Sequence, residues 1–167
     1  PPPLLRLANG SRYDHTPAPN GTALMSIPPN TVAKHERFWP LPDPALVLSF
    51  QPHMHFRGDR MLLEAIHPDG RREVLIDVNN YEQTWQLVYP FEEPHLFPKG
   101  TVLHNVTWHD NTSNNRHNPD PSAWIGWGGR TMDEMGHGWS DIAFMTEEQY
   151  EERLSKQQKE RTTNNDQ

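Results

Sequence analysis

Seven short stretches of the chain are rich in β-branched, aromatic and aliphatic residues, and turn residues separate nearly all of them. These stretches are 45–50, 61–66, 72–78, 84–89, 101–108, 122–127 and 139–145. Their length and composition are typical of β-strands, and their spacing is typical of an antiparallel sandwich or jelly roll. The segment HPDG at 67–70 predicts a hairpin turn, because Pro presets φ and Gly supplies a positive φ.

The two ends of the chain lack this pattern. Residues 1–45 are rich in Pro, Asn and Thr and show almost no periodicity, which predicts an irregular extended arm packed on the domain or on a partner. Residues 146–167 predict a helix, because Thr146 can cap it and its acidic residues precede its basic ones. Only Tyr150 and Leu154 are apolar there, so we expect a polar helical tail.

Length and composition fit one all-β domain, over residues 46–145, between these two ends. The chain has 167 residues, and its 17 prolines disfavour long helices. The hydrophobic fraction is 34% and the mean hydropathy is −0.89, but six Trp, six Phe and four Tyr can still build a core. The sequence starts with three prolines and no initiator Met, so we expect a mature or trimmed piece of a longer protein.

Charge and missing residue types exclude several function classes. The formal net charge is −7 with no basic cluster, so nucleic acid is not an expected partner. No run of 18 apolar residues occurs, so no segment is expected to span a membrane. The chain has no cysteine, which excludes disulfides, iron–sulfur clusters and thiolate zinc sites.

Two histidines, His53 and His55, stand one residue apart at the end of the first predicted strand. Side chains alternate along a strand, so both imidazoles share one face and Met54 points to the other. Their Cα atoms would lie about 6.8 Å apart, which lets both rings reach one metal ion. The spacing alone is equally compatible with a surface pair, or with one core histidine beside an exposed one.

Other side chains offer ways to complete a metal site. His104 shares a face with apolar residues, which favours a buried, hydrogen-bonded role, whereas His109 opens a loop and is ambiguous. His137 is the most conspicuous of the remaining histidines. Met132 and Met135 lie in a glycine-flanked polar stretch, and a thioether is a soft ligand that suits Cu(I). Two His and one Met would form a neutral ligand set with an open position.

A cupin-like site is another way to use the His pair. Cupins place a Glu shortly after the pair and a further His after a PxG turn. Here Glu64 comes nine residues after His55. His104 follows its turn one residue late, which rotates its side chain to the other face of the strand. The spacing therefore disfavours a cupin.

Three stretches, 52–89, 93–103 and 109–135, together resemble the C-terminal domain of the copper type II, ascorbate-dependent monooxygenases. That family includes the peptidylglycine α-hydroxylating and dopamine β-type enzymes. The resemblance runs through most of residues 45–145, and its most specific parts are the HxH pair, the loop "DNTSNNRHNPDP" and the closing "TMDEM". It implies an antiparallel sandwich of about eight or nine strands that holds one copper ion.

The resemblance also implies the ligands of this copper ion. In the family, the HxH pair and the Met of the "DEM" motif bind it, which carries over to His53, His55 and Met135. Asp133 and Glu134 would orient the loop that holds the methionine. No catalytic residue beyond these ligands is implied. The copper would activate O2 for hydroxylation of an organic substrate, with ascorbate or another reductant as electron donor.

Two departures from the family pattern change what is expected. Peptide-amidating members hold the substrate's terminal carboxylate with Arg, Asn and Tyr, and the matching positions here are Gln51, His137 and Trp139. Without the Arg a bidentate carboxylate clamp is lost, so a peptidylglycine substrate is not expected, and these three residues remain substrate-pocket candidates. The N-terminal electron-relay domain of the family is also absent. Because hydroxylation needs two electrons and one copper stores one, we expect an upstream domain or partner chain with a second copper or other redox centre.

The resemblance leaves two hypotheses for function. One is the oxygen-activating copper domain of a monooxygenase-like protein. The alternative is a non-catalytic structural or interaction subunit of a larger extracytoplasmic assembly, with the arm and the tail as docking elements. Both imply a periplasmic or secreted location.

Overall fold

The computed structural model describes residues 25–165, which form ten strands and one helix. The elements are β1 (Ser26–Ile27), β2 (Val32–Pro40), β3 (Ala45–Met54), β4 (Gly58–Ile66), β5 (Arg72–Val78), β6 (Tyr89–Phe97), β7 (Val102–Asp110), β8 (Ile125–Gly126), β9 (Gly136–Trp139), β10 (Ile142–Phe144) and α1 (Glu147–Asn165).

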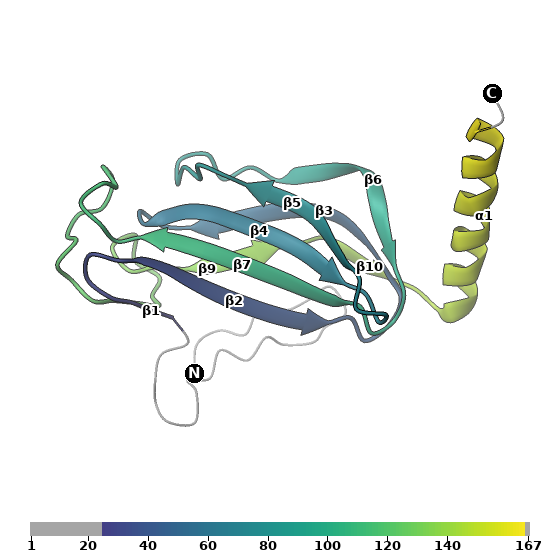
Figure 1. Cartoon of the computed structure of the whole chain (residues 1–167), viewed down its shortest axis with the longest axis horizontal. Coiled ribbons are helices and arrows are strands. Elements are labelled where there is room, and N and C mark those ends of the chain that lie inside the picture. Colours follow the sequence, from purple (N-terminus) through teal and green to yellow (C-terminus); the bar gives the residue numbers. More distant parts are fainter. Residues whose placement is uncertain (1–24, 166–167) are drawn as a thin grey trace.

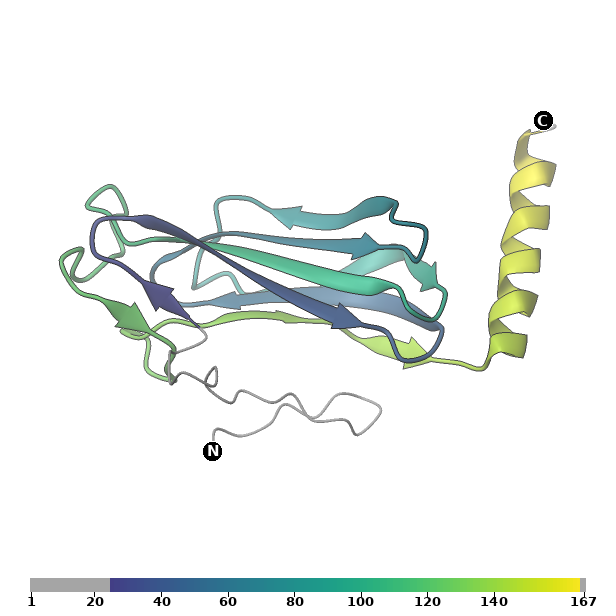
Figure 2. The ribbon, with the colours of Figure 1, turned by 60° about the horizontal axis from the view of Figure 1, so that its bottom comes forward.

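Two antiparallel four-stranded sheets form a β-sandwich, as Figure 1 and Figure 2 show. One sheet has the order β2-β7-β4-β5. The other has the order β10-β3-β6, with β9 also paired to β3, and β1 and β8 form a small separate ribbon. The prediction of an all-β antiparallel sandwich with a C-terminal helix is confirmed. The described residues contain no helix that is both long and apolar enough to cross a membrane.

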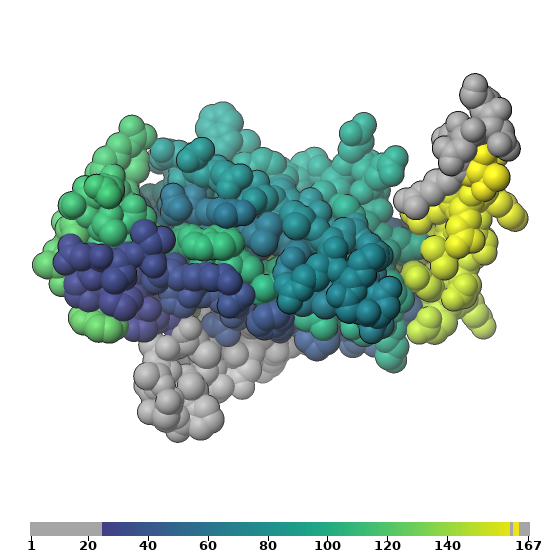
Figure 3. All heavy atoms as spheres, viewed as in Figure 1, coloured from purple at the N-terminus to yellow at the C-terminus, as the bar shows by residue number. Residues whose placement is uncertain are grey.

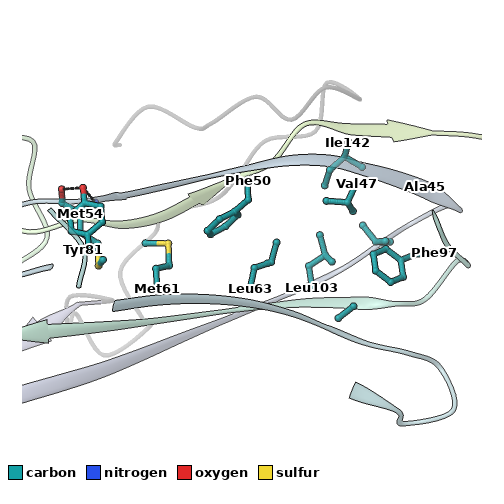
Figure 4. Close-up of a cluster of buried hydrophobic side chains, with 12 residues drawn as sticks. Ala45, Val47, Phe50, Met54, Met61, Leu63, Tyr81, Phe97, Leu103 and Ile142 are labelled. Atoms are coloured by element: carbon teal, nitrogen blue, oxygen red, sulfur yellow. Dashed lines mark hydrogen bonds between the residues drawn. The ribbon is translucent and has the colours of Figure 1, made fainter. Parts of the chain in front are cut away.

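The core lies between the two sheets. Figure 4 shows Val47 and Phe50 of β3 pointing toward Met61 and Leu63 of β4, and all four side chains are buried. Burial of each such side chain contributes about 1.5–3 kcal/mol. The strand stretches 45–50, 61–66, 72–78 and 101–108 all belong to this frame, as the apolar pattern predicted.

Strand β2 corrects the prediction of an irregular arm up to residue 45. It pairs with β7 over nine residues, from Val32 opposite Asp110 to Pro40 opposite Val102. Its residues alternate between exposed and half-buried, and none is fully buried, because β2 is the edge of its sheet and its outer face carries polar residues such as Lys34. A half-polar edge strand ending in Pro lacks the apolar run that marks a central strand. The arm predicted for residues 1–24 lies outside the described residues.

Strand β6 corrects a second part of the prediction. Residues 84–88 precede the strand, and the predicted turn at 92–100 is largely replaced by strand that continues to Phe97. β6 contains Pro90 and Pro94, which read as turn residues in the sequence. Both are tolerated because β6 is at the edge of its sheet, where a missing N–H donor disrupts no central ladder. The predicted strand at 122–127 is reduced to the two residues of β8.

The side-chain alternation of β3 changes phase near its middle. Ala45 and Val47 face the core in the first half, whereas Phe50 and Met54 face it in the second half. The change occurs where Ser49 and Phe50, adjacent residues, are both buried, and the pairing with β6 shifts register between Val47 and Ser49. Odd-numbered residues after this point therefore face away from the core.

The predicted polar tail forms helix α1. Thr146 and Gln149 make a reciprocal capping pair: the Gln149 N–H donates to Thr146 Oγ1 (3.3 Å) and the Thr146 N–H donates to Gln149 Oε1 (3.0 Å). Tyr150, Leu154 and Gln157 are half-buried, and the other described side chains of the helix are exposed. Figure 3 shows the helix, in yellow, at one end of the molecule beside the sandwich. It contributes little to the core.

The close approach of β9 to the core depends on Gly138. A Cβ atom at this position would lie 2.6 Å from Phe50 Cε2 and 2.9 Å from Asn105 Oδ1. We expect Gly138→Ala to lower the free energy of unfolding by about 1–3 kcal/mol through overpacking. Urea denaturation measures this effect. Gly126→Ala is the control, since nothing lies within 4 Å of its added Cβ, and an equal loss in both variants would contradict the explanation.

Candidate metal centre

His53 and His55 lie at the end of β3, at the far end of the sandwich from α1. Because of the phase change in β3, His53 points away from the core, while Met54 between them is fully buried in it. The two imidazoles meet edge to face, with ring centroids 5.3 Å apart. The predicted alternation of these three residues is confirmed.

Each of the two imidazoles is held through its Nδ1 atom. His53 Nδ1 lies 2.5 Å from Gln86 Oε1, and His55 Nδ1 lies 3.0 Å from the carbonyl oxygen of Asp133. The Gln86 amide is itself fixed, because its Nε2 donates to the carbonyl of Gln83 (2.8 Å) and so presents oxygen to the ring. Both acceptors are oxygens, so both Nδ1 atoms carry the proton and both Nε2 atoms keep a lone pair.

The Nε2 atoms are therefore the ones that can bind a metal. Neither forms a hydrogen bond with any residue between 25 and 165. Burial lowers the pKa of His53, and the hydrogen bond to Gln86 partly opposes this effect. The lowered pKa favours the neutral imidazole that metals require. Metal-binding histidines usually donate one ring N–H to an oxygen acceptor and use the other ring nitrogen to bind the metal.

The "DEM" segment is tied to the His pair through Glu134. This carboxylate is fully buried and accepts the backbone N–H of His55 (2.9 Å) and of Arg57 (2.6 Å). The backbone N–H of Met135 also donates to it (3.3 Å). Burial raises the pKa of Glu134, and these backbone donors oppose the rise. Glu134 thus brings the backbone of the predicted third ligand, Met135, close to the predicted first two.

The asparagine-rich loop is joined to the same network. Buried Arg57 donates from Nε to Asn111 Oδ1 (2.9 Å) and from Nη1 to the carbonyl of Met132 (3.0 Å). Asn115 donates to the carbonyl of Phe56 (3.0 Å), next to Arg57. The HxH, "DNTSNN" and "DEM" segments, which are far apart in sequence, therefore meet around one buried Arg.

The three substrate-pocket candidates lie beside His53. In the pairing of β3 with β9, Gln51 is opposite Trp139 and His53 is opposite His137. Trp139 stacks on His53 with ring centroids 4.9 Å apart, and His137 stacks on it at 6.2 Å. Gln51 donates from Nε2 to the carbonyl of Gln86 (3.3 Å). Among the described residues, the side of the candidate site beside His53 is thus aromatic, and position 51 there holds a Gln rather than an Arg that could clamp a carboxylate.

The residues of the cupin alternative lie elsewhere. Glu64 and His104 face each other across β4 and β7, in the sheet that does not contain His53, and His104 Nδ1 bonds to Glu64 Oε1 (2.6 Å). His104 also stacks on Phe38 (4.1 Å). The buried, hydrogen-bonded role expected for His104 agrees with these contacts. The geometry gives the cupin arrangement no support.

His109 belongs to the neighbourhood of the site, although the sequence left its role open. It is a β7 residue rather than a loop residue and is fully buried. Its Nε2 donates to the carbonyl of Met135 (3.0 Å). Burial lowers its pKa to about 4, so the ring is neutral. Alternation along "TVLHNVTWHD" could have identified it as an inward-facing residue had the strand been extended by two positions.

The donor set fits copper better than the common alternatives. No group of three or more His, Asp or Glu side chains within the described part of the chain is arranged to hold a metal. The predicted set instead has two imidazoles with open Nε2 atoms and one thioether, which suits Cu(I). No protein-family model matches the chain, and no curated protein matches it.

Proposed function

We propose that the chain is the oxygen-activating copper domain of a monooxygenase-like protein, in which His53, His55 and Met135 hold one copper ion. When bound, the copper supplies one-electron chemistry with O2, and ascorbate or a similar reductant supplies electrons through a partner domain or chain. The setting we propose is periplasmic or secreted. The observation that carries the proposal is the pair of open Nε2 atoms, since both rings are already held by their Nδ1 atoms.

The surroundings support a neutral, apolar organic substrate. Two exposed hydrophobic residues are sequence neighbours of residues that bond the two histidines: Trp85 precedes Gln86, and Met132 precedes Asp133. Trp139, partly exposed, stacks on His53 itself. No Arg stands at position 51 to pair with a carboxylate. These side chains would bind an apolar substrate and keep bulk water from the reacting centre.

The ligand set is tested by Cu(I) affinity under anaerobic conditions, with a competing chelator. We expect Met135→Ile to weaken Cu(I) binding at least about tenfold, because losing even an outer partner of a metal ligand costs about 10–100-fold. Met132→Ile is the matched control, since Met132 is exposed and only its backbone carbonyl takes part in the network. Equal affinity of wild type and Met135→Ile, in folded protein, would reject Met135 as a ligand.

Enzymatic function is tested separately by oxygen consumption. Copper-loaded wild-type chain with ascorbate and an apolar aromatic test substrate is expected to consume O2 faster than Met135→Ile. Copper binding without copper-dependent oxygen uptake, in the presence of a competent electron donor, would remove the monooxygenase assignment and leave the copper site.

Gln86 gives a prediction about the support of the site. We expect Gln86→Leu to weaken copper binding about 10–100-fold, because it removes the acceptor that fixes the tautomer and orientation of His53. Gln83→Leu is the control: it changes the same residue type in the same loop but keeps the backbone carbonyl that Gln86 uses. A similar affinity for both variants would show that Gln86 does not position the ring.

A second candidate function, a non-catalytic interaction subunit, is favoured by helix α1. The helix has 19 residues and few half-buried side chains, so packing on the sandwich does not account for it. Copper affinity combined with no hydroxylation would favour this function over the first.

A further inference from the structure

Unpartnered polar atoms gather inside the sandwich beneath β9. Four buried side-chain nitrogen or oxygen atoms of residues 25–165 have no hydrogen-bond partner, and three of them are His35 Nδ1, Asn105 Oδ1 and His109 Nδ1. In the pairing of β2 with β7, His35 is opposite Thr107, which stands between Asn105 and His109 on the same face. The three atoms therefore line one patch of the inner surface of this sheet.

The hydrogen bonds of the two rings show whether each Nδ1 atom carries a proton or a lone pair. His35 Nε2 lies 3.3 Å from the carbonyl oxygen of Ser26, and His109 Nε2 lies 3.0 Å from that of Met135. A carbonyl oxygen only accepts, so both Nε2 atoms carry the proton and both Nδ1 atoms are lone pairs. Neither ring can donate to the other. With Asn105 Oδ1, the patch presents three acceptors, each without a hydrogen-bond partner among the described residues.

The two rings are close enough to share a ligand. Their centroids are 5.4 Å apart and their planes are nearly perpendicular, at 72°. The facing strand presents Gly136, so no side chain from β9 fills the space opposite them. The methyl group of buried Met25 lies by Gly136, next to Thr107, which brings a thioether into the same region.

A bound cation would satisfy this patch. The carboxylate of Glu134 is 3.8 Å from His109 Nε2, so a negative charge is already near. Burying a singly charged ion costs less desolvation free energy than burying a doubly charged one. Neutral imidazole and thioether donors suit Cu(I).

We propose that His35 Nδ1 and His109 Nδ1 bind a Cu(I) ion inside the sandwich, with Met25 as a third ligand, at a site separate from His53, His55 and Met135. The two sites mirror each other, since each uses the imidazole nitrogen left open by a bond from the other nitrogen to an oxygen. If the proposed function holds as well, the interior ion would store the second electron of a hydroxylation within the same chain.

The test counts metal ions by native mass spectrometry and anaerobic titration, with Cu(I) and with Ag(I) as a redox-inert analogue. We expect two equivalents for the wild type, one for the double variant His53→Ala/His55→Ala, and none when His35→Phe is added to it. His117→Phe, a change at an exposed histidine outside both sites, is the control and should leave the count at two. Replacing the fully buried His109 would disturb folding, so His35→Gln serves as the second interior variant. Thermal unfolding checks that each protein is folded.

Each outcome separates the two proposals. One equivalent in the wild type that survives His35→Phe and is lost in the double variant overturns the interior site and leaves the outer one. One equivalent that is lost in His35→Phe and survives in the double variant supports the interior site and overturns the outer one. Imidazole ¹⁵N spectra of the double variant give an independent readout. The Nδ1 signals of His35 and His109 should shift when Ag(I) is added. A bridging water that persists between the rings, or binding of Zn(II) but not of Cu(I) or Ag(I), would overturn the proposal.

Discussion

Glu134→Ala is expected to lower the free energy of unfolding by about 3–5 kcal/mol, because it leaves a buried charge uncompensated. The carboxylate is fully buried and accepts the backbone N–H groups of His55 and Arg57. The guanidinium of Arg57 is equally buried, and its pKa is lowered by that burial although Glu134 works to raise it. Without the carboxylate, the backbone N–H groups of His55, Arg57 and Met135 lose their acceptor, and the buried guanidinium loses a nearby negative charge.

Urea denaturation at neutral pH measures this loss, in metal-free protein so that ligand binding does not contribute. Arg130→Gln is the control. Arg130 pairs with Asp133, the acidic neighbour of Glu134, but its side chain is 82% exposed, so the change should cost no more than about 1 kcal/mol. Glu134→Ala with a loss as small as that of the control would mean that Glu134 does not hold the three segments together.

The stability of the protein is expected to fall by about 2 kcal/mol between pH 10 and pH 12 because of Tyr81. The phenol is 7% exposed, accepts the Met54 N–H (3.0 Å) and donates to the Met54 carbonyl (2.7 Å). Burial raises its pKa from 10.0 to about 12. An acid whose pKa is higher in the folded state keeps its proton there while the unfolded chain loses it. The contribution is therefore complete below pH 10 and is lost as the pH rises toward 12.

Tyr81→Phe isolates this effect. The variant loses the two hydrogen bonds at every pH, but its free energy of unfolding should no longer include the decrease between pH 10 and pH 12. The quantity to measure is thus the difference between wild type and variant as a function of pH, which cancels the titration of other groups. A difference that stays constant over this interval would contradict the raised pKa.

The sequence predicted β4, β5 and β7 well because their apolar runs reflect burial directly. β5 spans the predicted residues 72–78, and β4 and β7 contain the predicted runs. Two edge strands, β2 and β6, were missed for a physical reason. β2 is half polar, and β6 contains two prolines, which an edge strand tolerates because one of its sides has no hydrogen-bonded neighbour. Edge position is a property of the sheet order, which local composition does not encode.

The candidate site was predictable only in part. Alternation was enough to place His53 and His55 on one side and Met54 on the other. The partners that hold the rings, Gln86 and the carbonyl of Asp133, come from loops more than 30 residues away, and one of them is a backbone atom whose identity leaves no trace in the sequence. Buried Arg57 was also missed, because an Arg beside a Gly at a strand end is typical of an exposed turn.

The odd-numbered residues of a strand face one side of the sheet and the even-numbered residues face the other. One extra residue in the strand exchanges the two sets. In β3 that switch lies between Val47 and Phe50, upstream of the HxH pair. Inserting one residue between Phe50 and Gln51, in a strand that stays regular from there on, would turn Met54 outward and bury His53 in the space that apolar side chains occupy. The orientation of the two imidazoles therefore depends on an irregularity several residues before them, and a change there would reposition core residues and candidate ligands together.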